Sequence, residues 1–380
     1  MENEINDDLY REIPVEEEDM GSSLMEDPFN PAEIDIDVKS PTIYNLIDRL
    51  SQTPPEIDLY ADFQRSDDLW EAEKQSRLIE SILIKFPLPA FYFDGSDDEK
   101  WLVVDGLQRL TSLKKFVIDK ELTLNGLEFL KDLEGKTYDE LPRTLKRTID
   151  STQVTAYIIK PGTPDQVKYN IFKRINTGGL VLTSQEIRHA LNQGIPSGLV
   201  ADLAGLDAFK LATGNKIASS RMLDREFVTR FVAFYIHSPE EYVPDLDSFL
   251  NRSMARIASL SKRERGQIKE NFIKSMETAH GIFNDWAFRN ADLYPLRRKP
   301  INKALFEVWS VALAKLPRKD CLSLITEKER VLENFAELCK DDSSFRGAIS
   351  SGTGKKNKVV TRFQKIQNLV SEVLLEILFK

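Results

Sequence analysis

The spacing of apolar residues changes close to Thr183, about midway along the 380-residue chain. Before that point, short apolar runs typical of strands alternate with stretches of helical spacing. After it, apolar residues recur three and four positions apart in almost every segment. The pattern predicts an α+β fold, in which a mixed α/β N-terminal domain is followed by an all-helical C-terminal domain.

Charge divides the chain a second time. Residues 1–38 hold 14 acidic side chains and one basic one, Arg11, a balance of −13; since the whole chain carries −9, the remaining 342 residues carry +4. Acidic, proline-containing sequence without sustained periodicity is typical of disorder. We therefore expect a disordered tail over 1–38, a mixed domain over 39–200 and a helical domain over 201–380. The alternative for the tail is a segment that docks on a partner or on a basic groove of the chain itself.

Several function classes are disfavoured by composition. No segment has the roughly 18 uncharged apolar residues of a membrane helix, and the acidic N-terminus lacks the features of a signal peptide. Two cysteines and three scattered histidines do not suit a disulfide framework, a thiolate zinc site or a Cys/His protease. We expect a cytoplasmic protein that does not associate with membranes.

The segment Trp101–Leu113 carries the clearest chemistry. A buried strand runs into Asp105 and Gly106 and then directly into a helix, whose first amides have no partner within the helix and attract anions. Arg109 offers a two-donor fork for a phosphate, and Asp105 can hold a divalent cation or orient a water. Gln108 in the first turn and the hydroxyl of Thr111, one turn further on, can join the same site.

Two other segments add cationic and amide groups. Gln64 and Arg65 stand between a predicted strand and a long predicted helix. Arg174 and Asn176 close another predicted helix, just before the pair Gly178-Gly179. Thr183-Ser-Gln-Glu186 then predicts a capping box that begins the next helix.

The order of these segments resembles a known family. Phe-Gln-Arg (63–65), Pro-Leu-Pro (87–89), Val-Asp-Gly-Leu-Gln-Arg-Leu-Thr (104–111) and Phe-Lys-Arg-Ile-Asn-Thr-Gly-Gly (172–179) occur in this order. Together they resemble the N-terminal domain family of GmrSD-type restriction systems, over about residues 40–200. That resemblance implies a ParB/sulfiredoxin-like core and a place in bacterial anti-phage defence or modification-dependent restriction.

The resemblance also implies roles for individual residues. Members of the family hydrolyse nucleoside triphosphates, and some use this to license DNA cleavage. The implied catalytic residues are Asp105, Gln108 and Arg109, with Asp105 also assisting Mg²⁺. The implied nucleotide contacts are Gln64, Arg65, Gly106, Thr111, Arg174 and Asn176. The chain departs from the family motif at Leu107, where a glutamine is common, and its C-terminal half lacks the histidine pattern of a fused nuclease.

A basic stretch near the C-terminus is a candidate nucleic-acid contact. Residues 340–365 hold seven basic side chains against two acidic ones. Such a stretch can bind a phosphate backbone or remain a solvated loop. The candidate contacts are Lys355, Lys356, Lys358 and Arg362.

We expect a nucleotide-binding protein that hydrolyses a nucleoside triphosphate with Mg²⁺, without a prediction for the base. Two alternatives stay open: a non-enzymatic DNA-binding or regulatory module with a degenerate nucleotide site, and a Mg²⁺-dependent DNA nuclease acting through Asp105. Besides the nucleotide, the candidate partners are DNA, a partner nuclease or other defence protein, and a second copy of the chain.

Overall fold

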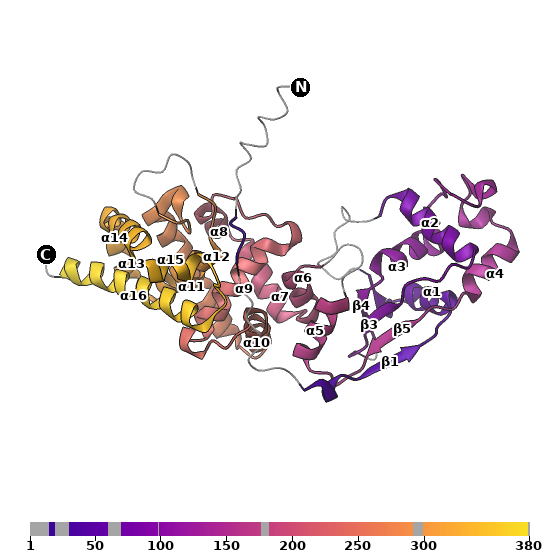
Figure 1. The fold of residues 1–380 in the computed structure, drawn as a ribbon, viewed down its shortest axis with the longest axis horizontal. Coiled ribbons are helices and arrows are strands. Elements are labelled where there is room, and N and C mark those ends of the chain that lie inside the picture. Colours follow the sequence, from indigo (N-terminus) through magenta and orange to yellow (C-terminus); the bar gives the residue numbers. More distant parts are fainter. Residues whose placement is uncertain are drawn as a thin grey trace, which may run out of the picture. The chain divides into compact units, whose positions relative to one another are not determined.

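Figure 1 shows the computed structural model of the chain, which describes residues 15–19, 30–59, 70–97, 99–175, 182–291 and 299–378. The chain divides into two compact units. We call Phe29–Leu191 the sheet unit, and Met1–Pro28 together with Asn192–Lys380 the helical unit. The α+β class predicted from the sequence is confirmed. The boundary between the units along the chain falls between residues 191 and 192, whereas the sequence suggested a boundary between 200 and 201.

The sheet unit is built on one five-stranded mixed sheet of order β1-β5-β3-β4-β2. The central strand β3 pairs in parallel with β5 and antiparallel with β4. At the edges, β1 is antiparallel to β5 and β2 is parallel to β4. The strands are β1 (Ile36–Lys39), β2 (Ile57–Asp58), β3 (Phe91–Asp94), β4 (Trp101–Asp105) and β5 (Ala156–Ile159).

Helices cover both faces of this sheet because side chains along each strand alternate between two apolar layers. Phe91 and Phe93 of β3 pack with the first group of helices, whereas Val104 of β4 and Ile159 of β5 pack with the second. The first group is α1 (Ile43–Ser51), α2 (Ala72–Leu83), α3 (Leu107–Leu113) and α4 (Arg143–Ser151). The second group is α5 (Asp165–Ile175) and α6 (Ser184–Leu191).

The helical unit has its own large apolar core, centred on α9, α11 and α12. Trp309 of α12 is fully buried and packs edge-on against Phe283 and Phe335. The helices are α7 (Ile195–Ala204), α8 (Asp207–Ala212), α9 (Leu223–Ile236), α10 (Leu246–Ala258), α11 (Lys262–Phe283), α12 (Lys303–Lys315), α13 (Arg318–Thr326), α14 (Lys328–Asp341), α15 (Ser343–Ser350) and α16 (Lys356–Leu378). None of the helices described is both long and apolar enough to cross a bilayer.

Local predictions fare unevenly. The capping box is confirmed, since the Thr183 amide donates to Glu186 Oε2 at 2.7 Å and the Glu186 amide donates to Thr183 Oγ1 at 3.2 Å. Residues 121–125, whose alternating apolar spacing is typical of a strand, are instead irregular, and their buried Leu122 and Leu124 join the core with α2 and α3.

Two described segments lie within the N-terminal 38 residues, for which a disordered tail is expected, whereas residues 1–14 and 20–29 lie outside the described parts of the chain. Val15–Asp19 packs along the helical unit, and Ile36–Lys39 forms the edge strand β1. Both segments place backbone groups against acceptors or donors far along the chain, at Ile301 and in β5. Composition describes only the average of the segment and does not reveal such pairings.

Candidate functional site

The candidate site lies where β4 ends and α3 begins. Tyr92 is opposite Asp105 and Phe93 is opposite Val103, so Val104 is the extra residue of a β-bulge. A bulge bends its strand and redirects the residues that follow. Asp105 therefore leaves the sheet at a bend, and Gly106 leads directly into the first turn of α3.

Gly106 is required at this bend for two reasons. Its φ is +104°, a region that side chains other than glycine rarely adopt, and a Cβ there would lie 2.5 Å from Cδ1 of Phe91. The glycine thus lets the chain turn tightly over the Phe91 ring. The turn leaves the first amides of α3 at the carboxyl end of β4, and such amides lack acceptors within their own helix.

Arg109 is held by the protein itself. Its Nη2 donates to Asp105 Oδ2 at 2.9 Å and to the carbonyl of Ala90 at 3.0 Å, and its Nη1 donates to the carbonyl of Pro89. The guanidinium also lies 4.4 Å from the centre of the Phe91 ring. Arg109 is only 7% exposed, and these contacts use three of its five donors. Burial lowers its pKa, and Asp105 opposes that effect.

The Asp105 carboxylate is more accessible, with 25% of its side chain exposed. Burial raises its pKa, while the charge of Arg109 and the Gly106 amide lower it, and the net shift is upward. The stacked rings of Tyr92 and Tyr157, 4.8 Å apart, lie on the neighbouring strands, and the pKa of Tyr92 is raised by burial, Tyr157 and Asp105.

A Mg²⁺ ion fits this donor set only with help from a ligand. Within the described parts of the chain, no group of three or more His, Cys, Asp or Glu side chains could hold a metal. One carboxylate is nevertheless sufficient where phosphates and waters supply the other oxygens. Asp105 is therefore suited to a Mg²⁺ that arrives with a nucleotide and not to a metal held by the protein alone.

Gln108 connects the site to another of the predicted segments. Its Oε1 accepts the amide hydrogen of Trp70 at 2.9 Å. Trp70 directly follows the segment that contains Gln64 and Arg65, which lie outside the described residues. The side chain of Gln108 thus joins Trp70 to the first turn of α3.

Arg174 is exposed in the last turn of α5. The Nζ of Lys168, in the first half of α5, lies 3.6 Å from Asp94 at the end of β3 that pairs with Leu102, the start of β4. The first half of α5 therefore lies beside the end of β3 that is farther from Asp105, whose partner on β3 is Tyr92. Thr111 is half-buried in α3, and Asn176 lies outside the described residues.

The predicted nucleic-acid contacts separate in the structure. Lys355 and Lys356 are exposed at the start of α16, and Lys358 is partly exposed. Arg362 is instead 1% exposed, and it donates to Glu307 Oε2 at 2.6 Å and to the Thr353 carbonyl at 2.6 Å. It is therefore a core residue with no surface to offer a phosphate backbone, because one turn of α16 carries it from the surface into the core.

The helical unit contains a buried ionic cluster that was not predicted from the sequence. Glu307 is fully buried and accepts hydrogen bonds from Arg230 at 2.7 Å and Arg362 at 2.6 Å. Arg230 also binds Glu18 of the N-terminal segment. The signal was present, since Glu307 and Arg230 are charges within helices whose neighbouring residues are apolar.

The comparison with known families agrees with these motifs. Residues 43–192 match the family described as GmrSD restriction endonuclease, N-terminal domain. The match runs from the first residue of α1 to the residue after α6, and so includes the β4–α3 junction. Neither a curated protein nor a solved structure matches the chain. The ParB/sulfiredoxin likeness of the core therefore stays a prediction.

The family takes its name from a restriction endonuclease, which connects this part of the chain with restriction-type, anti-phage function. The sheet unit, from α1 to α6 and with Asp105, Gly106 and Arg109 in it, therefore matches the family of GmrSD restriction endonuclease N-terminal domains.

Proposed function

We propose that the sheet unit binds a nucleoside triphosphate at the β4–α3 junction and hydrolyses it as part of a restriction-type defence system. The observation that carries the proposal is the glycine turn after Asp105, which presents the first amides of α3 at the end of a buried strand. Backbone amides at such a turn bind phosphate oxygens, and the helix dipole favours the negative charge.

Neighbouring groups complement the phosphate site in this proposal. Arg174, which is exposed in the last turn of α5, would supply a further cation to the phosphates. Asp105 would hold Mg²⁺ together with the phosphates of the nucleotide, and the ion would neutralise charge that develops during phosphoryl transfer. Arg109 holds Asp105 in position, because its guanidinium donates hydrogen bonds to the carboxylate and to two backbone carbonyls.

A second function is favoured by the same Arg109 contacts. An arginine whose donors are used by the protein contributes less to a transition state than a free one, and Leu107 removes a polar side chain from the first turn. A domain of this kind would bind nucleotide as a regulatory signal without turning it over. Phosphate release by the purified full-length chain, with and without DNA, distinguishes the two functions.

The test of nucleotide binding is a thermal-shift series with ATP, GTP, CTP and UTP in the presence of Mg²⁺. A ligand that binds only the folded state raises the melting temperature by mass action. We expect one nucleotide to raise it in the wild type and in the control Arg147→Ala, which removes an exposed arginine of α4, and we expect at least about tenfold more nucleotide to be needed for the same rise in Arg174→Ala. The absence of any shift, or equal shifts in both variants, would contradict the proposed site.

A further inference from the structure

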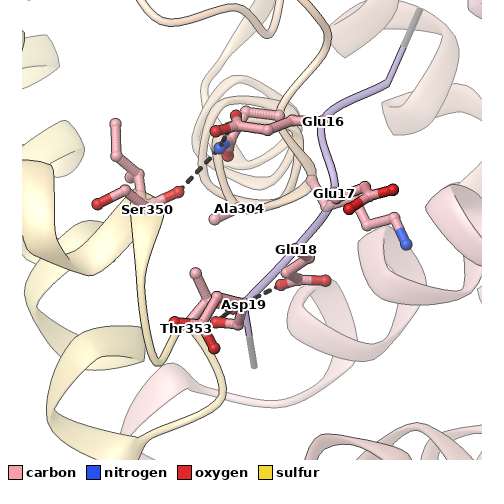
Figure 2. Close-up of a pocket in the computed structure, with 10 residues that line it drawn as sticks. Glu16, Glu17, Glu18, Asp19, Ala304, Ser350 and Thr353 are labelled. Atoms are coloured by element: carbon pink, nitrogen blue, oxygen red, sulfur yellow. Dashed lines mark hydrogen bonds between the residues drawn. The ribbon is translucent and has the colours of Figure 1, made fainter. Parts of the chain in front are cut away.

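A short acidic segment of the N-terminus is built into the helical unit. We call Val15–Asp19 the strap. The Glu16 amide donates to the Ile301 carbonyl at 2.8 Å, and the Thr353 amide donates to the Asp19 carbonyl at 3.1 Å. Figure 2 shows the strap running past Ala304, at the start of α12, and past Thr353, between α15 and α16.

The side chains of the strap alternate as they do in an extended strand. The strap lies in a small pocket of the helical unit. Glu16 and Glu18 are partly buried in this pocket, whereas Glu17 and Asp19 are exposed. Glu16 Oε2 accepts a hydrogen bond from Asn302 Nδ2 at 2.7 Å. The pocket is lined on its other sides by Asn302, Lys303, Ala304, Ile349, Ser350 and Thr353.

Glu18 binds Arg230, a cation that is only 4% exposed. Both of its oxygens accept hydrogen bonds from Arg230, at 2.6 and 3.2 Å, and Oε1 accepts another from the Thr353 hydroxyl at 2.7 Å. Burial by itself would raise the pKa of Glu18, but the charge of Arg230 and these hydrogen bonds, with a smaller effect of Lys303, lower it to about 2. The carboxylate is therefore strongly held in its charged form.

The charges around Glu18 balance only when an anion is present. Arg230, Arg362 and Lys303 face two carboxylates, Glu226 and Glu307, through ion pairs of 2.6 to 2.9 Å. Glu18 supplies the third negative charge. Because an uncompensated buried charge is costly, the pocket requires an anion in the position of the Glu18 carboxylate.

We propose that this pocket is a binding site for the phosphate backbone of nucleic acid, and that the strap occupies it as a removable competitor. The donors that hold Glu16 and Glu18 are the arginine fork, hydroxyl and amide groups that also bind phosphate oxygens. The two carboxylates stand two residues apart on extended chain, about 6.6 Å along the strap. Two anion positions in a row suit a polymer of phosphates better than a single small ion.

Basic side chains are also exposed just outside the pocket. Thr353, which holds the strap's Asp19, is followed closely by the exposed Lys355 and Lys356. A backbone that enters at Arg230 and leaves past these lysines would meet cations along its length. The strap itself is held mostly by polar contacts, with Val15 as its one apolar side chain on the core, so a more highly charged ligand can compete with it.

The proposal does not depend on the nucleotide site, and its test uses the full chain without nucleotide. The probe is a fluorescein-labelled 30-base-pair DNA duplex, titrated at several salt concentrations. We compare the wild type with Glu18→Gln and with Glu17→Gln, which removes the same charge from an exposed position of the strap. We expect Glu18→Gln to bind DNA about tenfold tighter, because the fraction of open pocket rises, and Glu17→Gln to stay within about twofold of the wild type.

A second measurement needs no variant. Hydrogen exchange of the wild type should show that DNA increases the exchange of the Glu16 amide, which the Ile301 carbonyl protects in the closed strap. Equal affinities in both variants, no DNA binding at low salt, or DNA binding with the strap amide still protected would each overturn the proposal. Release of the strap by millimolar inorganic phosphate alone would also overturn it, since the pocket would then be a small-anion site.

Discussion

Replacing Arg109 with alanine should destabilise the sheet unit, and the structure allows the cost to be worked out. The carbonyls of Pro89 and Ala90 lose their guanidinium donors, but Pro89 is exposed and Ala90 is half-buried, so water can replace these donors and each lost hydrogen bond costs about 0.5–1.5 kcal/mol. The partly exposed pair with Asp105 adds about 1 kcal/mol at most. The expected loss is about 2–3 kcal/mol, or a fall of roughly 5–10 °C in the melting temperature of a unit of this size.

Hydrogen exchange followed by mass spectrometry is the suitable assay, because it reports β3 and α3 separately from the helical unit. The matched control is Arg77→Ala on α2. Arg77 makes two ion pairs, with Glu73 at 2.7 Å and Glu128 at 3.0 Å, but 47% of its side chain is exposed. Its removal should cost less than about 1 kcal/mol.

The outcome decides what Arg109 does. The sequence alone suggested that this side chain contacts phosphate, and a side chain with that role alone could be removed without unfolding the domain. If Arg109→Ala keeps the protection of β3 and α3 to within about 1 kcal/mol and still loses nucleotide binding, the structural role argued from its contacts is refuted.

Three further predictions concern a backbone bend and the buried cluster. Gly106→Ala should lower the free energy of unfolding, measured by urea titration, by about 2 kcal/mol or more, because the position has a positive φ and the new Cβ clashes with Phe91. The control Gly135→Ala also has a positive φ but open space around it, so it should lose only about 1 kcal/mol. Glu307→Gln should cost about 3–5 kcal/mol by the same titration, because two buried arginines lose their shared carboxylate; a loss below 1 kcal/mol would contradict this. The pKa of Glu18 is about 2 in the folded protein, below its ordinary 4.5, so the stability that this carboxylate contributes is present above about pH 4.5 and is lost as the pH falls toward 2. The free energy of unfolding of the wild type should therefore fall more steeply over this range than that of Glu18→Gln. Parallel pH dependences of the two proteins would argue against the burial of this charge.

Much of the architecture was predictable because it depends on local patterns. The change from mixed to helical spacing near Thr183 correctly separated a sheet-containing half from a helical half. The capping box at Thr183 and Glu186 needs only residues three positions apart, and it formed as expected. Gly106 was chosen for its position between strand and helix, and the structure adds the reason, since the Phe91 ring leaves no space for a side chain.

The roles of the charged residues were decided only by tertiary structure. Arg109 was predicted as a phosphate ligand, but its acceptors at Pro89 and Ala90 lie 20 and 19 positions earlier, on a different element. Arg362 belonged to a basic stretch by composition, yet one turn of α16 places it in the core beside Glu307.

The N-terminal segment shows the same limit most clearly. By composition, residues 1–38 are an acidic, disorder-prone tail, and charge alone fixed their preference for a cationic surface. Glu18 finds its partners Arg230 and Thr353 at separations of 212 and 335 residues. A charge buried without a partner is costly, so the partner decides whether such a segment orders, and only the folded helical unit brings that partner to it.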